Sequence, residues 1–201
     1  MTTASLPLQG LTILDLSRVL ACPFASMILA ELGANVIKVE QPGEGDETRS
    51  FEPFVNRGDA SHPSESAYYM AFNRSKRSIT VNLRAPEGQQ LIRDLAAKAD
   101  VFVENFPVGA LKRYGLDYAA IKAVNECIVY VSCTGFGQTG PYAKRKGYDT
   151  VFQAMSGLMS LTGERGGGPV KPGLPVADLS SGLWVAIGIL SALQEIGRAH
   201  V

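Results

Sequence analysis

The chain has 201 residues, of which 46% are hydrophobic and 19% charged, the composition of a folded globular protein and not of a disordered one. Lys+Arg and Asp+Glu are equal at 19 each, so the sequence lacks the basic excess of a nucleic-acid or anionic-membrane binder. The N-terminus has neither the basic nor the apolar segment of a secretory signal, and the longest uncharged apolar run, residues 182–193, is too short to span a bilayer. We therefore expect a cytoplasmic protein with no membrane or nucleic-acid partner.

Cysteine and histidine are both scarce. Cys22, Cys127 and Cys133 are scattered, without a CxxC motif or histidine partners, a pattern typical of reduced cytosolic thiols. His62 and His200 are the only histidines. We therefore expect no metal site, and no nucleophile activated by a histidine.

The N-terminal part predicts a strand–helix–strand unit. Residues 11–16 (LTILDL) are expected to form a buried strand, residues 23–32 a helix that stops at Gly33, and residues 35–40 a second strand. Such units normally have parallel strands joined by a right-handed crossover. The polar residues 41–66 are expected to form a long loop, and loops of that length are usually functional or mobile.

Strands and helices continue to alternate after this unit. We expect strands at residues 79–83, 101–104 and 127–134, and helices at residues 86–98, 108–114, 117–124, 149–161 and 179–194. Asp117 is placed to cap its helix, and the glycine-rich residues 163–173 are expected to form a loop. The alternation predicts an α/β fold with a Rossmann-like, doubly wound parallel sheet.

The end of the chain differs in character. Residues 195–201 (EIGRAHV) break the helical pattern and are similar to translated sequencing adapter. We therefore expect residues 1–194 to be the N-terminal part of one large domain that is incomplete here, and residues 195–201 to be a non-native tail.

A glycine motif at residues 135–140 (GFGQTG) matches the G-x-G-x-x-G fingerprint of dinucleotide sites. That fingerprint must open a helix whose N-terminus faces the pyrophosphate. Here Pro141 and a basic segment follow, and the first strand–helix turn has no glycine. Glu40 imitates the ribose-binding acid of such sites, although a strand-end carboxylate is the simpler interpretation. We do not expect a nicotinamide or flavin site.

Basic residues gather near the predicted strand ends, where α/β folds bind ligands. They are Arg18, Arg74, Lys76, Arg77, Arg84, Arg113, Lys144, Arg145 and Lys146. A ligand with several phosphates needs several such donors, although each residue taken alone is better explained as a solvated surface charge. Asn105 and Phe106 offer an amide and an aromatic face to a nucleotide or pantetheine arm, or else form a turn with a core aromatic.

Asp178 lies between an apolar segment and a predicted helix, in PGLPVADLSSG. Such an aspartate is most often an N-cap. The shortage of histidine and the neighbouring basic residues favour a catalytic role. The backbone N–H groups at the helix start are also expected to stabilise the carboxylate as an anion that can attack a carbonyl.

Successive segments of the sequence carry a family resemblance. They are LQGLTILDLSRVLACPFASMILAELGANVIKVEQPGEGDETR, NRSKRSITVNL, ADVFVENFPVGALKRYGL, IVYVSCTGFGQTGPYAKRKGYD, SGLMSLTG and PGLPVADLSSG. They resemble, in order, the signature blocks of the family III CoA-transferases (CaiB/BaiF type, similar to formyl-CoA transferase). The resemblance covers residues 8–194 and is greatest to members that use succinyl-CoA and a dicarboxylate.

The resemblance implies that Asp178 is the catalytic nucleophile. In this family the aspartate attacks the donor thioester to give a mixed anhydride, and the released CoA thiolate then forms an aspartyl-CoA thioester. The acceptor, a small carboxylic acid, enters by the reverse sequence. A CoA thioester is thus implied as a substrate, with no tightly bound cofactor.

The resemblance also carries CoA contacts onto four segments. They are Arg18, Val19, Leu20 and Ala21; Val81, Asn82, Leu83 and Arg84; Asn105, Phe106, Pro107 and Arg113; and Lys146, Gly147, Tyr148 and Asp149. Two positions depart from the family pattern. Cys22 replaces a glycine of many members and is expected to crowd the first loop, and Gln41 replaces an arginine of some members, which argues against a diphosphate contact there.

The family's chain continues well beyond this one. Its further part is implied to supply a glycine-rich loop over the active site and to take part in an interlocked homodimer. We therefore expect residues 1–201 alone to be inactive and poorly soluble, because apolar surface is left uncovered.

Two alternatives stay open. The same family contains α-methylacyl-CoA racemases, which carry a histidine in the block that here reads KGYDT. Tyr148 stands there instead, and a tyrosine phenol is a poor base at neutral pH. The other alternative is a CoA-binding module without chemistry.

Overall fold

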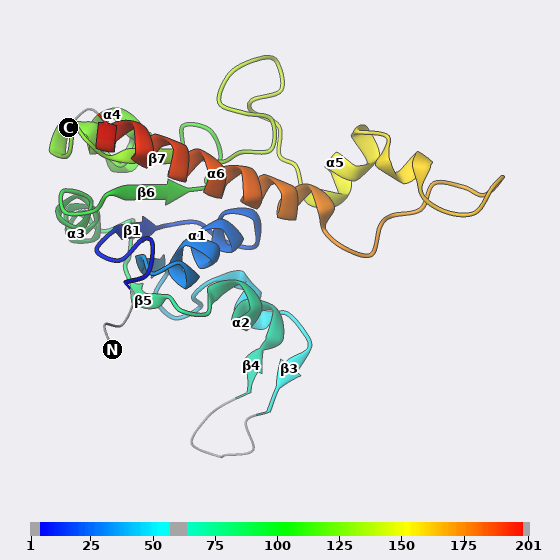
Figure 1. The fold of residues 1–201 in the computed structure, drawn as a ribbon, viewed down its shortest axis with the longest axis horizontal. Coiled ribbons are helices and arrows are strands. Elements are labelled where there is room, and N and C mark those ends of the chain that lie inside the picture. The colour runs from blue at the N-terminus through cyan, green and yellow to red at the C-terminus, as the bar shows by residue number, and fades with distance from the viewer. Residues whose placement is uncertain (1–4, 57–63, 199–201) are drawn as a thin grey trace.

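Five parallel strands form the central sheet of the computed structural model, which describes residues 5–56 and 64–198 (Figure 1). Their order is β5-β2-β1-β6-β7. In this doubly wound order the chain adds β2 and β5 on one side of β1 and then returns to add β6 and β7 on its other side. The strands are β1 (Thr12–Asp15), β2 (Asn35–Glu40), β5 (Arg77–Thr80), β6 (Val101–Glu104) and β7 (Val129–Ser132). A separate antiparallel pair joins β3 (Phe54–Val55) to β4 (Glu65–Ser66). The structure confirms the predicted α/β fold.

Helices cover both faces of this sheet. The α-helices are α1 (Ala21–Glu31), α2 (Ala67–Asn73), α3 (Pro86–Ala96), α4 (Tyr118–Val124), α5 (Asp149–Met155) and α6 (Val176–Arg198). Short 3₁₀ turns occur at η1 (Glu47–Ser50), η2 (Lys112–Tyr114) and η3 (Leu158–Leu161). In Figure 1, α6 runs across the body beside α1 and leads out to α5 and the loop that follows it, which together project as an arm.

Alternate side chains of each strand enter two separate cores. Leu14 and Phe102 face one core with α3 and α4, whereas Ile13 and Val103 face the other with α1 and α6. This alternation follows from the period of two along a strand. The two cores bury the sheet on both faces, which leaves the carboxyl ends of its strands as the edge open to a ligand.

Most of the predicted elements are present with small shifts. The predicted bounds of β2 and β6 are confirmed, whereas β5 begins two residues earlier than expected, at Arg77. The predicted helix at residues 108–114 is reduced to η2, and α6 extends from Val176 to Arg198. Asp117 stands at the N-cap of α4, but its side chain makes no capping hydrogen bond, so that prediction was wrong in its mechanism.

The segment at residues 41–66 is only partly the loop we expected. It contains η1, β3 and β4, and residues 57–63 lie outside the described part of the chain. Helix α2 follows β4 directly. We did not predict this helix, because it is only seven residues long and comes directly after a polar segment. The expected boundary between residues 194 and 195 lies inside α6, and the origin of residues 195–201 stays a prediction.

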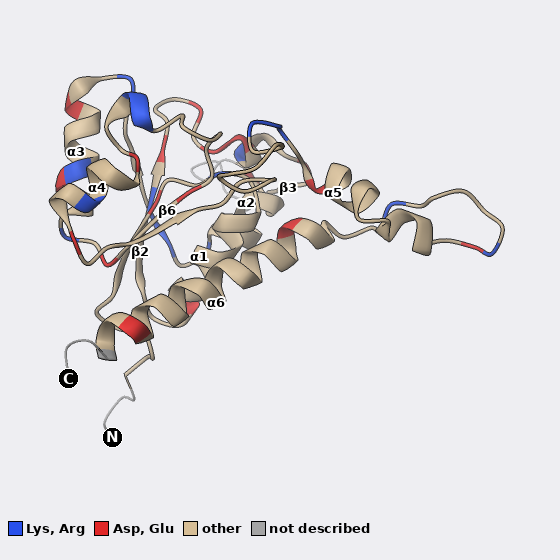
Figure 2. Ribbon diagram, turned by 90° about the horizontal axis from the view of Figure 1, so that it is seen from above, with Lys and Arg blue, Asp and Glu red and all other residues tan. Residues whose placement is uncertain are grey.

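Helix α6 is long and apolar for a helix at the surface. Val176–Gly197 could cross a membrane by length and composition alone, a test that core helices of soluble proteins also pass. It packs along α1. The sequence between Asp178 and Glu195 has no charged residue, and most of the helix is accordingly tan in Figure 2. Its outer face exposes Leu183, Trp184 and Ile187, with Trp184 72% exposed.

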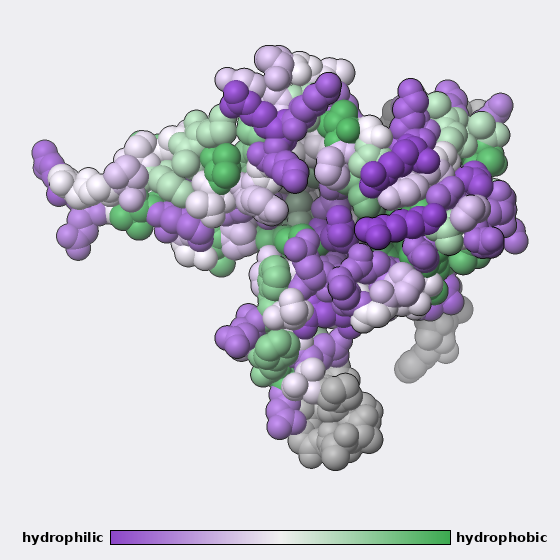
Figure 3. Space-filling model, turned by 180° about the vertical axis from the view of Figure 1, so that it is seen from behind, coloured by the Kyte–Doolittle hydropathy of each residue, from purple (hydrophilic) through white to green (hydrophobic). Residues whose placement is uncertain are grey.

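The surface is divided by hydropathy. Seen from behind, hydrophilic side chains crowd the middle of the molecule, whereas hydrophobic side chains show along the arm that carries α5 (Figure 3). Leu161, at the end of η3, is 87% exposed. The arm therefore presents apolar surface that no part of the described chain covers.

Candidate active site

A cavity of about 680 Å³ lies at the carboxyl ends of β1, β2, β5 and β6. It is lined by Leu16, Arg18, Val39, Glu40, Gln41, Pro42, Glu44, Val81, Asn82, Leu83, Arg84, Phe106, Pro107, Ala110, Arg113 and Tyr114. This is the crevice where open α/β sheets bind ligands. Its volume is sufficient for a nucleotide.

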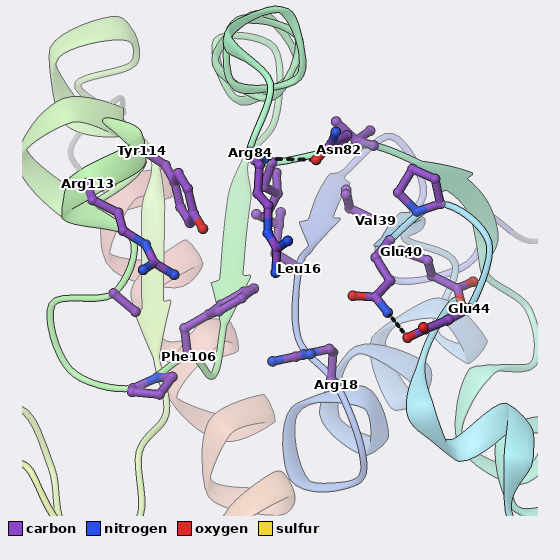
Figure 4. Close-up of a pocket in the computed structure, with 16 residues that line it drawn as sticks. Leu16, Arg18, Val39, Glu40, Glu44, Asn82, Arg84, Phe106, Arg113 and Tyr114 are labelled. Carbon is purple, nitrogen blue, oxygen red and sulfur yellow. Dashed lines mark hydrogen bonds between the residues drawn. The ribbon is translucent and has the colours of Figure 1, made fainter.

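Three arginines reach into this cavity from different sides, with the Phe106 ring among them (Figure 4). The Arg18 guanidinium lies 5.1 Å from the centre of the Phe106 ring, and that of Arg113 lies 4.6 Å from the centre of the Tyr114 ring. Arg84 comes from the turn after β5, where the Arg84 backbone N–H donates to the Asn82 side-chain oxygen at 3.0 Å. Guanidinium groups with free N–H donors are suited to phosphate oxygens.

The opposite wall is acidic, and its two carboxylates accept hydrogen bonds from within the chain. The Gln41 amide donates to the Glu44 carboxylate at 2.5 Å (Figure 4). Glu40 accepts two hydrogen bonds of 2.8 Å from Arg49. Burial disfavours the Glu40 anion, but the Arg49 guanidinium and the Ser78 hydroxyl outweigh it and lower the pKa of Glu40 to about 2. Glu40 is therefore committed to an internal ion pair and is not free to bind a ribose.

The loop between β1 and α1 is held from several directions. Asp15 accepts a hydrogen bond from the Ser17 backbone N–H at 2.9 Å, and the buried Lys38 donates to the Ser17 carbonyl at 2.9 Å. The Asn105 side chain makes two hydrogen bonds with the Arg18 backbone. It accepts from the Arg18 N–H at 2.9 Å and donates to the Arg18 carbonyl at 2.7 Å. Val19 has a φ of 71°, a conformation that a β-branched residue adopts only under constraint. This loop is therefore fixed before a ligand arrives.

Buried ion pairs support the same loop from below. Lys76 lies 3.2 Å from Asp15, and Lys38 lies 2.8 Å from Asp46, with both lysines 1% exposed. Burial lowers the pKa of Lys76 to about 8, although Asp15 opposes that change. Burial would raise the pKa of Asp15, but Lys76 and Lys38 outweigh it, so the pKa lies below its ordinary value.

Asp178 is the third residue of α6 and is half-buried. The backbone N–H groups of Ala177 and Asp178 donate to the Asp149 carboxylate, at 2.8 and 3.3 Å. Burial, and then the Asp149 carboxylate, raise the pKa of Asp178 to about 6. The prediction that the helix start stabilises the Asp178 anion was therefore wrong, because Asp149 takes those donors. Among the residues that the structure describes, no cation pairs with Asp178, and its carboxylate is more basic than that of an ordinary aspartate.

A glycine places Asp178 beside the first loop. A Cβ atom at Gly182 would lie 2.5 Å from the Ala21 carbonyl oxygen, so α6 approaches the start of α1 as closely as a glycine allows. Asp178 precedes Gly182 by four residues and therefore lies on the same face of the helix, one turn nearer its start. The carboxylate thus points to the side of α6 where the loop of residues 18–21 lies.

Tyr68 of α2 is a neighbour of Asp178 that the sequence did not indicate. Burial raises the pKa of the Tyr68 phenol to about 12, and the Asp178 and Asp149 carboxylates add to this effect. A phenol that keeps its proton is a hydrogen-bond donor beside the carboxylate. No motif marks Tyr68, since helix α2 was itself missed.

The structure brings together only part of the predicted site. Cavity-lining residues among those predicted are Arg18, Val81, Asn82, Leu83, Arg84, Phe106, Pro107 and Arg113. Val19, Leu20 and Ala21 lie in the adjoining loop, and Asn105 holds that loop. Lys146, Gly147 and Tyr148 lie outside the lining, with Tyr148 74% exposed, and Asp149 serves the start of α6. Their role as CoA contacts stays a prediction.

Three of the remaining basic residues are engaged elsewhere. Arg74 pairs with Glu31 at 3.2 Å, Arg77 donates to Asn35, and Lys76 is buried with Asp15. The GFGQTG segment forms turns and leads into a loop without opening a helix, as expected. Among the residues that the structure describes, no group of three or more His, Cys, Asp or Glu side chains is arranged to hold a metal ion.

Comparison with known proteins identifies a family for this chain. The model of CoA-transferase family III matches residues 8–200. Human succinyl-CoA:glutarate CoA-transferase is 50% identical over 94% of this chain and 42% of its own length. Succinate–glutarate CoA-transferase of Agrobacterium fabrum is 50% identical over 96% of this chain and 48% of its own. The chain thus spans less than half the length of these curated relatives.

A solved structure agrees over the whole fold. A CaiB/BaiF family protein from Brucella suis superposes with a TM-score of 0.93 at 48% identity, covering 98% of this chain and 51% of that one. The match includes the sheet, the helices on both faces and the segment that carries Asp178. Together with the family model, it shows that this chain belongs to CoA-transferase family III.

Proposed function

We propose that the full-length protein moves CoA from an acyl-CoA thioester to a small carboxylic acid, with Asp178 as the nucleophile. One observation carries this proposal. An unpaired carboxylate on α6 faces the same loop, residues 18–21, that borders a cavity lined by three arginines. A nucleophile and a phosphate-binding cavity thus meet at one loop.

The proposed reaction needs four acyl steps. The Asp178 carboxylate attacks the donor thioester, which breaks the C–S bond and gives a mixed anhydride and CoA thiolate. The thiolate attacks the aspartyl carbonyl, releases the donor acid and leaves an aspartyl-CoA thioester. The acceptor carboxylate attacks that thioester to give a second anhydride and CoA thiolate. The thiolate then attacks the acceptor carbonyl, which yields the new acyl-CoA and restores Asp178.

The environment of Asp178 suits the first step. With a pKa of about 6, its carboxyl is mostly ionised at neutral pH, yet it is more basic than an ordinary aspartate. Greater basicity at a given degree of ionisation favours nucleophilic attack. The absence of a paired cation at Asp178 among the described hydrogen bonds and ion pairs leaves its oxygens available to a carbonyl carbon.

The substrates are proposed from the relatives and the cavity. The human and Agrobacterium relatives are named for succinyl-CoA or succinate and glutarate. We propose the same pair here, with the phosphates of CoA held by Arg18, Arg84 and Arg113. The Phe106 ring offers a flat face to the adenine or the pantetheine arm.

Assembly and location are proposed on different grounds. Leu183, Trp184 and Ile187 form an exposed apolar face on α6 that a second chain, or a further part of the same chain, would bury. We expect a homodimer, in which such faces are covered. A cytoplasmic location stays a prediction that rests on the pattern of the sequence.

Trapping the intermediate tests the proposal. Full-length protein is incubated with succinyl-CoA, treated with hydroxylamine and mapped by mass spectrometry, while product acyl-CoA is followed with glutarate and a panel of other acids. We expect a hydroxamate at Asp178 and transfer to glutarate. Transfer with the adduct on another side chain would refute Asp178. Deuterium exchange at C2 of a 2-methylacyl-CoA without transfer would show a racemase instead.

A further inference from the structure

Gln153 of α5 is a buried polar residue that no sequence motif marks. It is 1% exposed, on a helix that packs against α6 (Figure 1). The Gln153 amide donates two hydrogen bonds, to the Asp149 carboxylate at 2.5 Å and to the Leu174 carbonyl at 3.0 Å. Leu174 lies in the segment that leads into α6, and Asp149 accepts hydrogen bonds from backbone N–H groups in the first turn of that helix. One amide therefore holds two supports of the start of α6.

The orientation of this amide follows from its two partners. A carboxylate and a carbonyl are both acceptors, so the nitrogen of the Gln153 amide, and not its oxygen, must face them. The oxygen is buried, and no group among the residues that the structure describes donates to it. Gln153 thus acts toward the described chain as a donor alone, a role that an apolar side chain of similar length cannot fill.

The Asp149 carboxylate divides its two oxygens between α5 and α6. One oxygen accepts from the backbone N–H groups of Ala177 and Asp178, at 2.8 and 3.3 Å. The other oxygen accepts from Gln153, which lies four residues further along α5. Asp149 is 8% exposed, so loss of the Gln153 donor would leave a buried carboxylate oxygen without this partner. The carboxylate would then be free to turn away from the start of α6.

The neighbouring residue, Phe152, fixes α5 itself. A Cβ atom at Gly135 would lie 2.5 Å, and one at Gly147 would lie 2.2 Å, from the Cζ atom of Phe152. The backbone therefore approaches this ring at both positions as closely as a glycine allows. Gly135 lies shortly after β7, and Gly147 lies shortly before α5. Because its neighbour is enclosed in this way, Gln153 donates from a fixed base.

We propose that Gln153 is a positioning residue for the nucleophile, which holds the first turn of α6, and with it Asp178, by way of Asp149. This inference rests on the proposed function, in which Asp178 attacks the acyl carbon. Asp178 is the third residue of α6, so a shift of that turn displaces its carboxylate directly. A misplacement of about 1 Å can slow a reaction by about 10²-fold. Gln153 acts through Asp149 and takes part in no bond-making step.

The same contact affects the basicity of Asp178. After burial, the Asp149 carboxylate is the second cause that raises the pKa of Asp178 to about 6. The other titratable groups that interact with Asp178 are Tyr68 of α2 and Cys133 after β7, neither of them a cation. Helix α1, which also packs on α6, has no charged residue before Glu31. If Asp149 turned away, the pKa of Asp178 would therefore fall toward its ordinary value.

Gln153→Met in the full-length protein removes the donor and keeps the length of the side chain. We expect the turnover rate of CoA transfer to fall about 10- to 100-fold, with little change in KM for the acyl-CoA, because the arginine-lined cavity is untouched. Transfer by the unaltered protein should decline as pH falls through about 6, where Asp178 takes up a proton, and in the variant this midpoint should move to lower pH.

Gln90→Met is the matched control. Gln90 also donates to an aspartate four residues away on its own helix, Asp94 of α3 at 2.7 Å, but it is exposed. This variant should change neither the rate nor the midpoint. A general loss of stability would reduce the amount of active protein at every pH without moving the midpoint. An unchanged rate in Gln153→Met, or a lower rate with the midpoint in place, would therefore overturn the positioning role.

Hydrogen–deuterium exchange tests the contacts without an assay of activity. The peptide that contains residues 176–182 should exchange faster in Gln153→Met than in the unaltered protein, and Gln90→Met should leave it unchanged. Equal exchange in all three proteins would overturn the proposal. Unaltered protein that transfers no CoA, with the expected difference in exchange, would instead refute the proposed function and confirm that Gln153 holds the start of α6.

Gln153→Glu gives a second test if the methionine variant does not fold. It has nearly the same shape, but at pH 8 it presents a carboxylate to Asp149 in place of a donor, and residues 176–182 should lose protection. At pH 5 the new carboxyl should hold a proton, donate to Asp149 and restore the protection, once the intrinsic effect of pH on exchange is allowed for. Protection that is the same at both pH values would contradict the proposed contact.

Discussion

The cavity at the strand ends and the neighbourhood of Asp178 differ in how they are built. The cavity is enclosed by loops that follow four strands of one sheet, and its charged supports are paired inside the chain, as Arg49 with Glu40 and Lys38 with Asp46. Asp178 lies at the start of a helix whose outer face is open, with Trp184 72% exposed. The cavity is therefore lined by residues of this chain that are held by internal pairs, whereas Asp178 lies beside an exposed apolar helix face.

The two regions also use burial in opposite ways. In the cavity wall, Arg49 and Ser78 overcome burial and lower the pKa of Glu40 to about 2, which fixes the charge of the wall at any physiological pH. At α6, burial and the Asp149 carboxylate raise the pKa of Asp178 to about 6. A paired carboxylate holds structure, and an unpaired one keeps the basicity that a nucleophile needs.

We expect the largest effect from removal of the Asp178 carboxylate, which should lower CoA transfer without preventing CoA binding. Asp178→Ala in the full-length protein should lower CoA transfer by more than about 10³-fold, because no other carboxylate occupies its place, while CoA still binds. Steady-state rates and calorimetric titration with CoA measure the two quantities. A variant that retains transfer, or that loses CoA binding in equal proportion, would show that the two regions are not distinct.

Removing a cavity arginine should have the reverse profile. Arg84→Ala should raise the dissociation constant for CoA about 10- to 100-fold, since a charge-assisted hydrogen bond contributes about 1.5–3 kcal/mol. The rate at saturating CoA should change little. Arg77→Ala is the matched control. Arg77 is exposed, as Arg84 is, but it lies at the start of β5 and outside the cavity. Equal effects of both substitutions would mean that only overall charge matters.

The sequence predicted the sheet better than its supports. The runs at β2 and β6 were placed correctly because buried parallel strands read as continuous apolar segments. The same β2 contains Lys38 and Glu40, both buried, and nothing local in the sequence indicates that Asp46 and Arg49 neutralise them. Ion pairs of this kind depend on where loops return to the sheet, which periodicity does not reveal.

The candidate site was likewise predicted only in part, because local sequence does not show which side chains become buried. The basic residues after the strands were correctly connected with the cavity for Arg18, Arg84 and Arg113, because strand ends share one edge of a parallel sheet. Lys76 had the same local signal but is buried against Asp15, which is 61 positions away in the sequence. Cys133 also packs against a buried cluster that contains Cys22, and only the completed fold brings these distant segments together.

The packing of α6 on α1 offers a smaller effect with an internal control. A methyl group at Gly182 would collide with the Ala21 carbonyl, whereas Gly188 of the same helix has open space around it. Gly182→Ala should therefore reduce the free energy of unfolding by about 1–2 kcal/mol and slow transfer by moving Asp178. Gly188→Ala should be neutral or stabilise by up to about 1 kcal/mol, because alanine favours the helix. Denaturant unfolding compares them, and equal outcomes would contradict the close contact.

The smallest effect is a dependence of stability on pH. The pKa of Asp178 is raised from 3.8 to about 6 in the folded protein, so the folded state holds this proton more strongly than the unfolded state does. The resulting stability is fully present below pH 4 and is lost as pH rises through 6. Asp178→Asn cannot ionise and should therefore be more stable than the unaltered protein at pH 7.5, by about 1 kcal/mol once water screening of the half-buried carboxyl is allowed for.

The difference in the free energy of unfolding between Asp178→Asn and the unaltered protein should itself depend on pH. Denaturant unfolding at intervals from pH 4 to 8 should show the two proteins converging near pH 4 and separating between pH 4 and 6. Asp94→Asn is the control, because Asp94 is exposed on α3, where the Gln90 side chain donates a hydrogen bond to it. It should show no such gap. A gap for Asp178→Asn that is constant with pH would mean that Asp178 titrates as an ordinary aspartate and would remove the basicity on which its proposed role as a nucleophile depends.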